Sequence, residues 1–114
     1  EGHLLFSMAV EREGRRTHFM YLIGSDGKLL AQASGTADER MHASLSGKAL
    51  MGGRVVCATD EGLLSLRVDS GRLVEGTLFT DTQPFVAAGH ELLAGPGGSV
   101  YVVGTQEIVC LTLA

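Results

Sequence analysis

The sequence predicts an all-β protein, and three observations carry this prediction. Short apolar runs rich in valine and leucine alternate with turn residues, as in successive strands. Glycine is frequent, with 16 residues against only two prolines, which favours many tight turns. The strand pattern also repeats after about 45 residues, as shown below. At 114 residues the chain has the size of one ordinary domain.

The clearest strands lie in residues 54–79. Apolar runs at 55–58, 63–68 and 73–79 are separated by turn residues at 59–62 and 69–71. Asp and Ser bond to the local backbone and Gly supplies positive φ, so these separators favour an antiparallel meander. A helix is excluded because Gly62, Gly71 and Gly76 interrupt every span of useful length.

The remaining strands follow in chain order. Residues 4–10 and 17–23 predict a hairpin whose charged loop is 11–16, and residues 28–33 follow a Ser-Asp-Gly turn. A short strand is expected near 48–51. Two more are expected within 99–113, after the segment 84–95.

Two internal matches define the repeat. Leu22, Gly27 and Leu29 coincide with Leu66, Gly71 and Leu73 at an offset of 44 residues. Residues 99–113 coincide with 54–68 at an offset of 45, which aligns Val100 with Val55 and Leu111 with Leu66. A period of about 40–45 residues with about four strands is typical of a β-propeller blade. We therefore expect Leu66 and Leu111 to occupy equivalent buried positions.

The predicted fold is thus a partial β-propeller of about three antiparallel, four-stranded meander blades. The blades would cover residues 3–35, 43–79 and 84–114 of one all-β unit, with the first lacking its inner strand and the last its outer strand. Residues 55–58 and 100–103 are apolar without alternation, which predicts burial of both faces between neighbouring blades. A small antiparallel β-sandwich or barrel is the alternative fold.

Residues 66–74, LRVDSGRLV, resemble the repeat of quinoprotein-like (PQQ-like) propellers, in which a Leu precedes a Ser-Gly-Arg turn and the outer strand. Residues 26–30, DGKLL, resemble the same element, which WD-like propellers share in broad outline. The resemblance implies the fold and an interaction or scaffold role. It implies no cofactor, because Ala31 and Glu75 stand where that family has its docking aromatic residue.

Connections between strands of a meander alternate between its two ends. One end therefore gathers the segments 11–16, 38–42, 59–62, 80–83 and 104–107, which hold twelve of the chain's charged residues. Loops on a rigid scaffold carry function, although solvated loops are the simpler explanation. The candidate binding residues on this charged rim are Arg15, Arg16, Asp38, Arg40, His42, Asp60 and Asp81.

No catalytic or metal site is predicted. Asp60 and Glu61 are adjacent in a turn and rarely converge. His42 beside Asp38 and Glu39 could form a metal corner, but we expect a surface loop histidine. Both cysteines lie in apolar strands, so we expect Cys57 and Cys110 to be buried and unbonded, which favours a reducing, cytoplasmic compartment.

Composition limits the partners. A net charge of −4 argues against broad binding to nucleic acid or to an acidic membrane, and no apolar run approaches a transmembrane helix. The chain begins with Glu1 rather than Met, so we expect a processed protein or a piece of a longer one. The expected partner is another protein, the remaining blades, or a second copy through unpaired edge strands.

The expected function is a non-catalytic protein-interaction or scaffold module. Two alternatives stay open: a fragment of a propeller enzyme whose active site lies in the central channel, and a ligand-sensing propeller domain. A cavity with converging polar residues would favour the alternatives, and a flat rim with apolar or arginine anchors would favour the interaction module.

Overall fold

A computed structural model describes residues 2–43 and 47–113, and it is all-β, which confirms the predicted class. None of the helical segments in these two ranges is long and apolar enough to cross a membrane. The strands are β1 (Leu4–Arg12), β2 (Arg15–Ile23), β3 (Leu29–Gly35), β4 (Lys48–Met51), β5 (Arg54–Thr59), β6 (Gly62–Asp69), β7 (Arg72–Phe79), β8 (Glu91–Ala94), β9 (Ser99–Val103) and β10 (Ile108–Thr112). Short 3-10 helices are η1 (Arg40–His42), η2 (Thr80–Phe85) and η3 (Pro96–Gly98).

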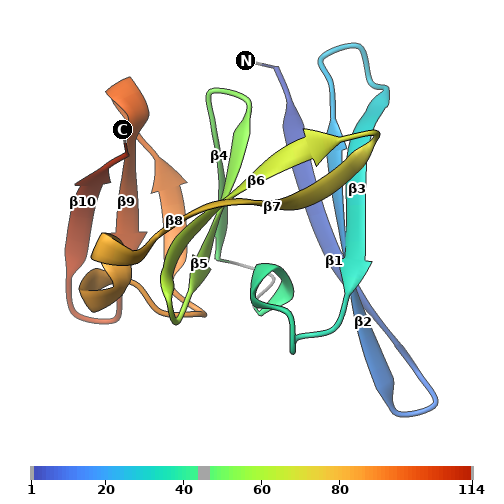
Figure 1. Cartoon of the computed structure of the whole chain (residues 1–114), viewed down its shortest axis with the longest axis horizontal. Coiled ribbons are helices and arrows are strands. Elements are labelled where there is room, and N and C mark those ends of the chain that lie inside the picture. The colour runs from blue at the N-terminus through green and yellow to red at the C-terminus, as the bar shows by residue number, and fades with distance from the viewer. Residues whose placement is uncertain (1, 44–46, 114) are drawn as a thin grey trace.

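The strands form two sheets (Figure 1). A seven-stranded sheet has the order β1-β2-β3-β7-β6-β5-β4 and curls into a half-barrel, and a three-stranded sheet has the order β10-β9-β8. Within each sheet, strands that are consecutive in sequence pair antiparallel, as the turn residues between them predict, except that β3 does not pair with β4.

The pairing of β3 with β7 is parallel, which differs from the purely antiparallel prediction. It consists of the pair Gln32 and Arg72, and the Gln32 N–H donates to the Gly71 carbonyl at 3.1 Å. Gly71 follows Ser70 in a turn where both residues have positive φ, which presents this carbonyl to β3. β3 and β7 are far apart in the sequence, so no local sequence pattern predicts their contact.

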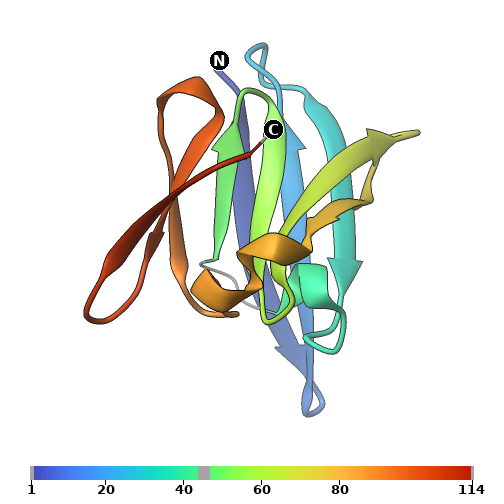
Figure 2. The same cartoon turned by 60° about the vertical axis from the view of Figure 1, so that its left-hand side comes forward.

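Strand β5 and the first five residues of β6 have both faces buried, as the non-alternating run at 55–58 predicted for β5. Val55 and Cys57 enter a first apolar cluster with Met20, Leu22 and other side chains of β1–β3. Val56 and Ala58 point the other way, into a second cluster that includes side chains of β8 and β9. Figure 2 shows the result: the three-stranded sheet and the β1–β3 hairpins stand on opposite sides of β4 and β5.

The residues that the 45-residue offset aligns form one cross-strand pair in each sheet. Val55 pairs with Leu66 in the seven-stranded sheet, and Val100 pairs with Leu111 in the three-stranded sheet. Leu66 is buried in the first cluster, whereas Leu111 is half-buried against the second. Each pair faces the strand group that precedes it in the chain. The expectation that both leucines are buried holds for Leu66 and is wrong for Leu111.

The β1–β3 group is oriented differently from the β4–β7 and β8–β10 groups. Leu22 and Leu66 are equivalent in the repeat, yet both enter the first cluster and so point toward the same core. In a propeller, Leu22 and Leu66 would point the same way around the ring, so that each would face a different neighbouring blade. The strands of the first two predicted blades instead form one seven-stranded sheet, with β1–β3 folded over so that Leu22 faces Leu66.

A buried threonine fixes the connection between the two sheets. Thr82 in η2 accepts a hydrogen bond from the Leu63 N–H at 2.8 Å and donates to the Phe79 carbonyl at 2.6 Å. Gly62 lies beside it with φ of +119°, and a Cβ there would meet the Phe79 carbonyl oxygen at 2.6 Å. The chain can therefore pass from β7 into η2 only with glycine at this position.

The cysteine prediction is corrected in one respect. Both thiols are free, and Cys57 is buried in β5, but Cys110 is exposed on β10. Cys110 lies opposite Tyr101 on the face of the three-stranded sheet that points away from the second cluster.

Replacing Leu66 by Ala should lower the free energy of unfolding by about 2–5 kcal/mol, because a buried side chain leaves a cavity. Leu111→Ala should cost about 1–2 kcal/mol, since Leu111 is only half-buried. Urea denaturation of both variants measures this order; equal and small losses would contradict the packing.

Replacing Thr82 by Val keeps the shape but removes the acceptor of the buried Leu63 N–H. We expect a loss of about 1–3 kcal/mol in thermal or urea unfolding. Thr80→Val at the exposed neighbouring threonine is the matched control and should change stability by less than about 0.5 kcal/mol. Similar stability of the two variants would refute the anchoring role.

Candidate functional site

The predicted rim connections do lie at one end of the molecule, at the bottom of Figure 1. Arg40 in η1 forms an ion pair with Glu61 in the β5–β6 turn at 2.6 Å. The carboxylate of Asp60 accepts a hydrogen bond from the Ala88 N–H at 2.9 Å, which joins the same turn to the segment after η2. The alternation of the connections was therefore readable from the sequence.

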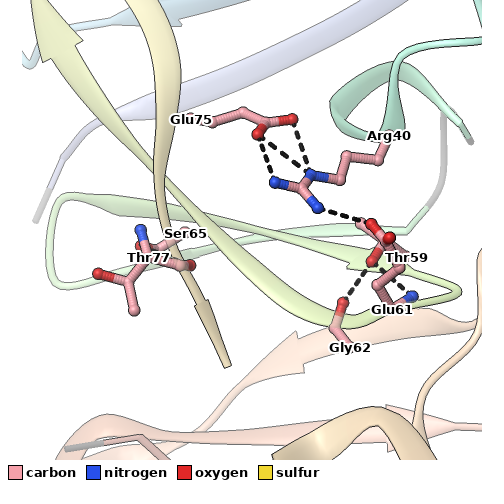
Figure 3. A network of polar contacts seen from close by, with 7 residues as sticks. All are labelled: Arg40, Thr59, Glu61, Gly62, Ser65, Glu75 and Thr77. Carbon is pink, nitrogen blue, oxygen red and sulfur yellow. Dashed lines mark hydrogen bonds and ion pairs between the residues drawn. The ribbon is translucent and has the colours of Figure 1, made fainter. Parts of the chain in front are cut away.

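Arg40 is the centre of a polar network (Figure 3). Its Nε donates to both carboxylate oxygens of Glu75 in β7 at 3.1 and 3.0 Å, and its Nη2 donates to Glu75 Oε1 at 2.8 Å. Its Nη1 donates to Glu61 Oε1 at 2.6 Å. These hydrogen bonds raise the pKa of Arg40. The guanidinium is thus occupied within the chain, and it ties η1 to β7.

The turn that carries Glu61 is itself held in place. Thr59 Oγ1 donates to the Gly62 carbonyl at 2.7 Å and accepts from the Glu61 N–H at 3.0 Å (Figure 3). Because Thr59 is buried, these bonds fix the backbone of the turn from below. The local sequence Thr-Asp-Glu-Gly therefore positions Glu61 for Arg40.

The expectation of a surface histidine at position 42 is wrong. His42 is 2% exposed, and its ring lies edge-on to that of His18 with centroids 6.4 Å apart. The cause is Met41, whose side chain enters the first apolar cluster and draws the short η1 against the end of the sheet. An isolated loop histidine gives no periodic signal, so the sequence could not predict this burial.

Two further titratable groups lie near the histidines. Lys48 and Cys57 are paired across β4 and β5, and Lys48 acts on both imidazoles through its charge. Burial lowers the pKa of His42, where Glu39 opposes the shift and Lys48 and His18 add to it. Burial, Arg16 and Lys48 lower the pKa of His18.

The chemistry open to this buried cluster is limited. Burial lowers the pKa of Lys48 and raises that of Cys57 to about 11, so the Cys57 thiol is protonated at neutral pH and is a poor nucleophile. His18 Nδ1 is buried and has no hydrogen-bond partner among the described residues. Across residues 2–43 and 47–113, no three His, Cys, Asp or Glu side chains are placed to hold a metal ion.

The other predicted rim residues remain exposed. Arg15 and Arg16 begin β2 at the tip of the first hairpin, Asp38 precedes η1, and Asp60 and Asp81 lie in the β5–β6 turn and in η2. The structure brings Asp60 next to the segment after η2 but leaves Arg15 and Arg16 at the far hairpin. Binding by these five residues stays a prediction.

A second candidate surface was not identified from the sequence. On the face of β1 and β2 that points away from the first cluster, Leu4, Phe6 and Met8 are 59%, 49% and 37% exposed. Phe6 stacks on Tyr21, and Tyr21 stacks on Phe19, each with ring centroids 6.3 Å apart. We call this surface the aromatic face; its residues are Leu4, Phe6, Met8, Val10, Thr17, Phe19, Tyr21 and Ile23, which pair across β1 and β2.

A signal for the aromatic face does exist in the sequence. In residues 4–10 and 17–23, the odd-numbered and the even-numbered positions are both largely apolar. Each strand therefore has an apolar face toward the core and a second apolar face on the other side. Two of the four phenylalanines and one of the two tyrosines lie on the outer set. Contiguous exposed apolar surfaces are typical of sites that contact other molecules, which makes this face a candidate.

Comparison with known proteins adds no assignment. No protein-family model matches the chain, and neither curated proteins nor solved structures gave a match. The function must therefore be argued from the residues themselves.

The buried histidines predict a pH dependence of stability. Their folded pKa values lie below the unfolded value of 6.5, so the unfolded chain binds protons first as the pH falls. The free energy of unfolding should be level above about pH 7 and should fall below pH 6.5, by at most about 1.4 kcal/mol per pH unit for each histidine.

Urea unfolding at pH 7.5, 6.5 and 5.5 measures this slope. His42→Leu removes one of the titrating groups and should flatten the dependence, whatever its effect on stability at pH 7.5. An unchanged slope in this variant would show that His42 does not titrate differently in the folded state.

Proposed function

We propose that this chain is a non-catalytic protein-interaction or scaffold module that binds its partner through the aromatic face. The observation that carries the proposal is the exposure of Leu4, Phe6 and Met8 in a row along one strand. Apolar and aromatic side chains that stay in contact with water gain free energy when a partner covers them. Rigid aromatic residues also lose little conformational entropy on binding, which suits them as interface anchors.

The position of β1 supports the same proposal. It is an edge strand of the seven-stranded sheet, nine residues long and without proline. Its apolar part carries no charge before Glu11, and charges or prolines are the usual means of blocking an edge. A partner strand could therefore add to β1 and extend over the aromatic face.

We further propose that residues 48–79 and 91–112 are propeller-type blades of the PQQ-like kind. The support is their repeated register and the way in which equivalent residues face the preceding strand group. The outer face of the three-stranded sheet also exposes Leu93 and Ile108, 55% and 67% respectively. Further blades or a second copy of the chain would cover such a face.

The polar residues at the rim do not favour an enzyme or a sensor. Arg40 is occupied by Glu75 and Glu61, and His42 is buried beside His18. These groups hold the loops to the sheet, which is a structural use of their charge and hydrogen bonds. The interaction module is therefore the function that we adopt.

Photo-cross-linking in the native cells tests this proposal. With p-benzoylphenylalanine in place of Phe6, we expect a discrete adduct with one partner protein or with a second copy of the chain. Val68, an apolar residue that is 50% exposed at the end of β6, is the matched control position and should give little adduct. The second substitution Phe19→Ser should remove the adduct at Phe6.

The proposal fails if position 6 gives no adduct, or if positions 6 and 68 give the same pattern. Circular dichroism of each variant confirms that the fold is retained, because Phe6 and Val68 both point into solvent.

A further inference from the structure

Two shallow pockets lie on the aromatic face, one on each side of Phe19. The first has a volume of about 320 Å³ and is lined by Phe19, Tyr21, Gln32, Ala33, Ser34 and Arg72. The second has a volume of about 370 Å³ and is lined by Val10, Arg12, Thr17 and Phe19. Phe19 is thus the wall that the two pockets share, and each pocket has an arginine at its outer side.

The charges of these pockets have one sign. Arg72 and Arg12 are the only charged residues that line them. Arg15 lies directly opposite Arg12 in the strand register, and Asp69, which pairs with Arg67 at 3.9 Å, lies opposite Arg72. Both lining arginines are exposed, and neither forms an ion pair within the described part of the chain. A guanidinium binds a carboxylate through two parallel hydrogen bonds, so each pocket is complementary to an acidic side chain.

The strand register gives the separation of the two arginines. Arg12 pairs with Arg15, while Tyr21 pairs with Gln32, which in turn pairs with Arg72. The six residues from Arg15 to Tyr21 span about 20 Å along β2, and β1 to β7 is three strand spacings, about 14 Å. The diagonal is about 24 Å, which an extended peptide covers with about seven residues.

We infer that the aromatic face binds an extended protein segment that carries acidic residues about seven positions apart, with apolar side chains between them. The apolar side chains pack in the two pockets against Phe19, and the carboxylates pair with Arg12 and Arg72. This inference rests on the proposed function, because it places the partner on the same face. It adds the chemistry and the length of the segment that is bound.

Single-stranded nucleic acid is the rival that shares some of this chemistry, because aromatic rings and arginines also bind stacked bases and phosphates. One feature favours the acidic segment. The rings are surrounded by the aliphatic side chains of Leu4, Met8 and Ile23, which offer nothing to a base edge or a phosphate.

Fluorescence anisotropy with synthetic peptides tests the inference on the full chain. The probe is a fluorescein-labelled, capped peptide with two glutamates at each end of the core Val-Phe-Leu-Val. The controls replace all four glutamates by glutamine or by lysine. We expect binding of the glutamate peptide that weakens with added salt, and at least about tenfold weaker binding of the lysine peptide.

Protein variants locate the site. Arg12→Gln and Arg72→Gln should each weaken binding of the glutamate peptide by about two- to fivefold, because each removes one exposed ion pair. Phe19→Ala should weaken it by about tenfold or more, since both pockets lose their common wall. Arg54→Gln is the matched control, an exposed arginine in β5 that lines neither pocket, and it should leave the affinity unchanged.

Three results would overturn the inference. The first is equal binding of the glutamate and lysine peptides, or no loss in the two arginine variants. The second is tighter binding of a fluorescein-labelled octauridylate than of the glutamate peptide, which would assign the face to nucleic acid. The third is no peptide binding while light scattering shows a dimer that Phe6→Ser dissociates, which would assign the face to a second copy.

These outcomes separate the inference from the proposed function. Cross-linking at position 6 without binding of the glutamate peptide leaves the interaction module standing and refutes the acidic segment. Binding of the peptide with the expected variant pattern supports both.

Discussion

The structure depends on one packing constraint, which is that β5 and β6 have apolar side chains on both faces. A strand with two apolar faces is stable only between two other layers, because each uncovered face would cost free energy in water. Val55 and Cys57 therefore require the β1–β3 group on one side, and Val56 and Ala58 require the β8–β10 sheet on the other. The outward faces of these two flanking groups are what remains for contact with other molecules.

Polar interactions then hold the connections between the layers. Arg40 links η1 to β7 and to the β5–β6 turn, and Thr82 links η2 to β6. Each of these groups satisfies backbone or charged atoms that would otherwise lose their hydrogen bonds when the loops pack against the core. At the centre of the rim, charged and hydroxyl groups therefore hold the loops to the sheets.

The sequence predicted the all-β class and most strand positions, because turns and local periodicity encode them. It did not predict that β1–β3 packs with Leu22 toward Leu66, since both alternating sets of residues 17–23 are largely apolar and neither is marked as inner. The parallel contact of β3 with β7 depends on the same long-range choice.

The site shows the same limit. The gathering of the rim loops follows from strand alternation and was predicted. The burial of His42 follows from the packing of its neighbour Met41, which a loop sequence does not reveal. The sequence does not reveal which residues form the aromatic face, because both alternating sets of residues in β1 and β2 are largely apolar and neither is marked as the inner one.

The central claim is that the packing which buries one face of β1 and β2 leaves the aromatic face open to solvent. The four methionine methyl groups report on it directly when they are isotopically labelled and a soluble paramagnetic agent is added to dilute protein. Met8 lies on the aromatic face and is 37% exposed, whereas Met20 and Met41 are 1% and 8% exposed in the first cluster. The account predicts strong relaxation enhancement at Met8 and weak enhancement at Met20 and Met41. Enhancement of Met20 equal to or greater than that of Met8 would contradict it, because β1–β3 would then present its other face to the core.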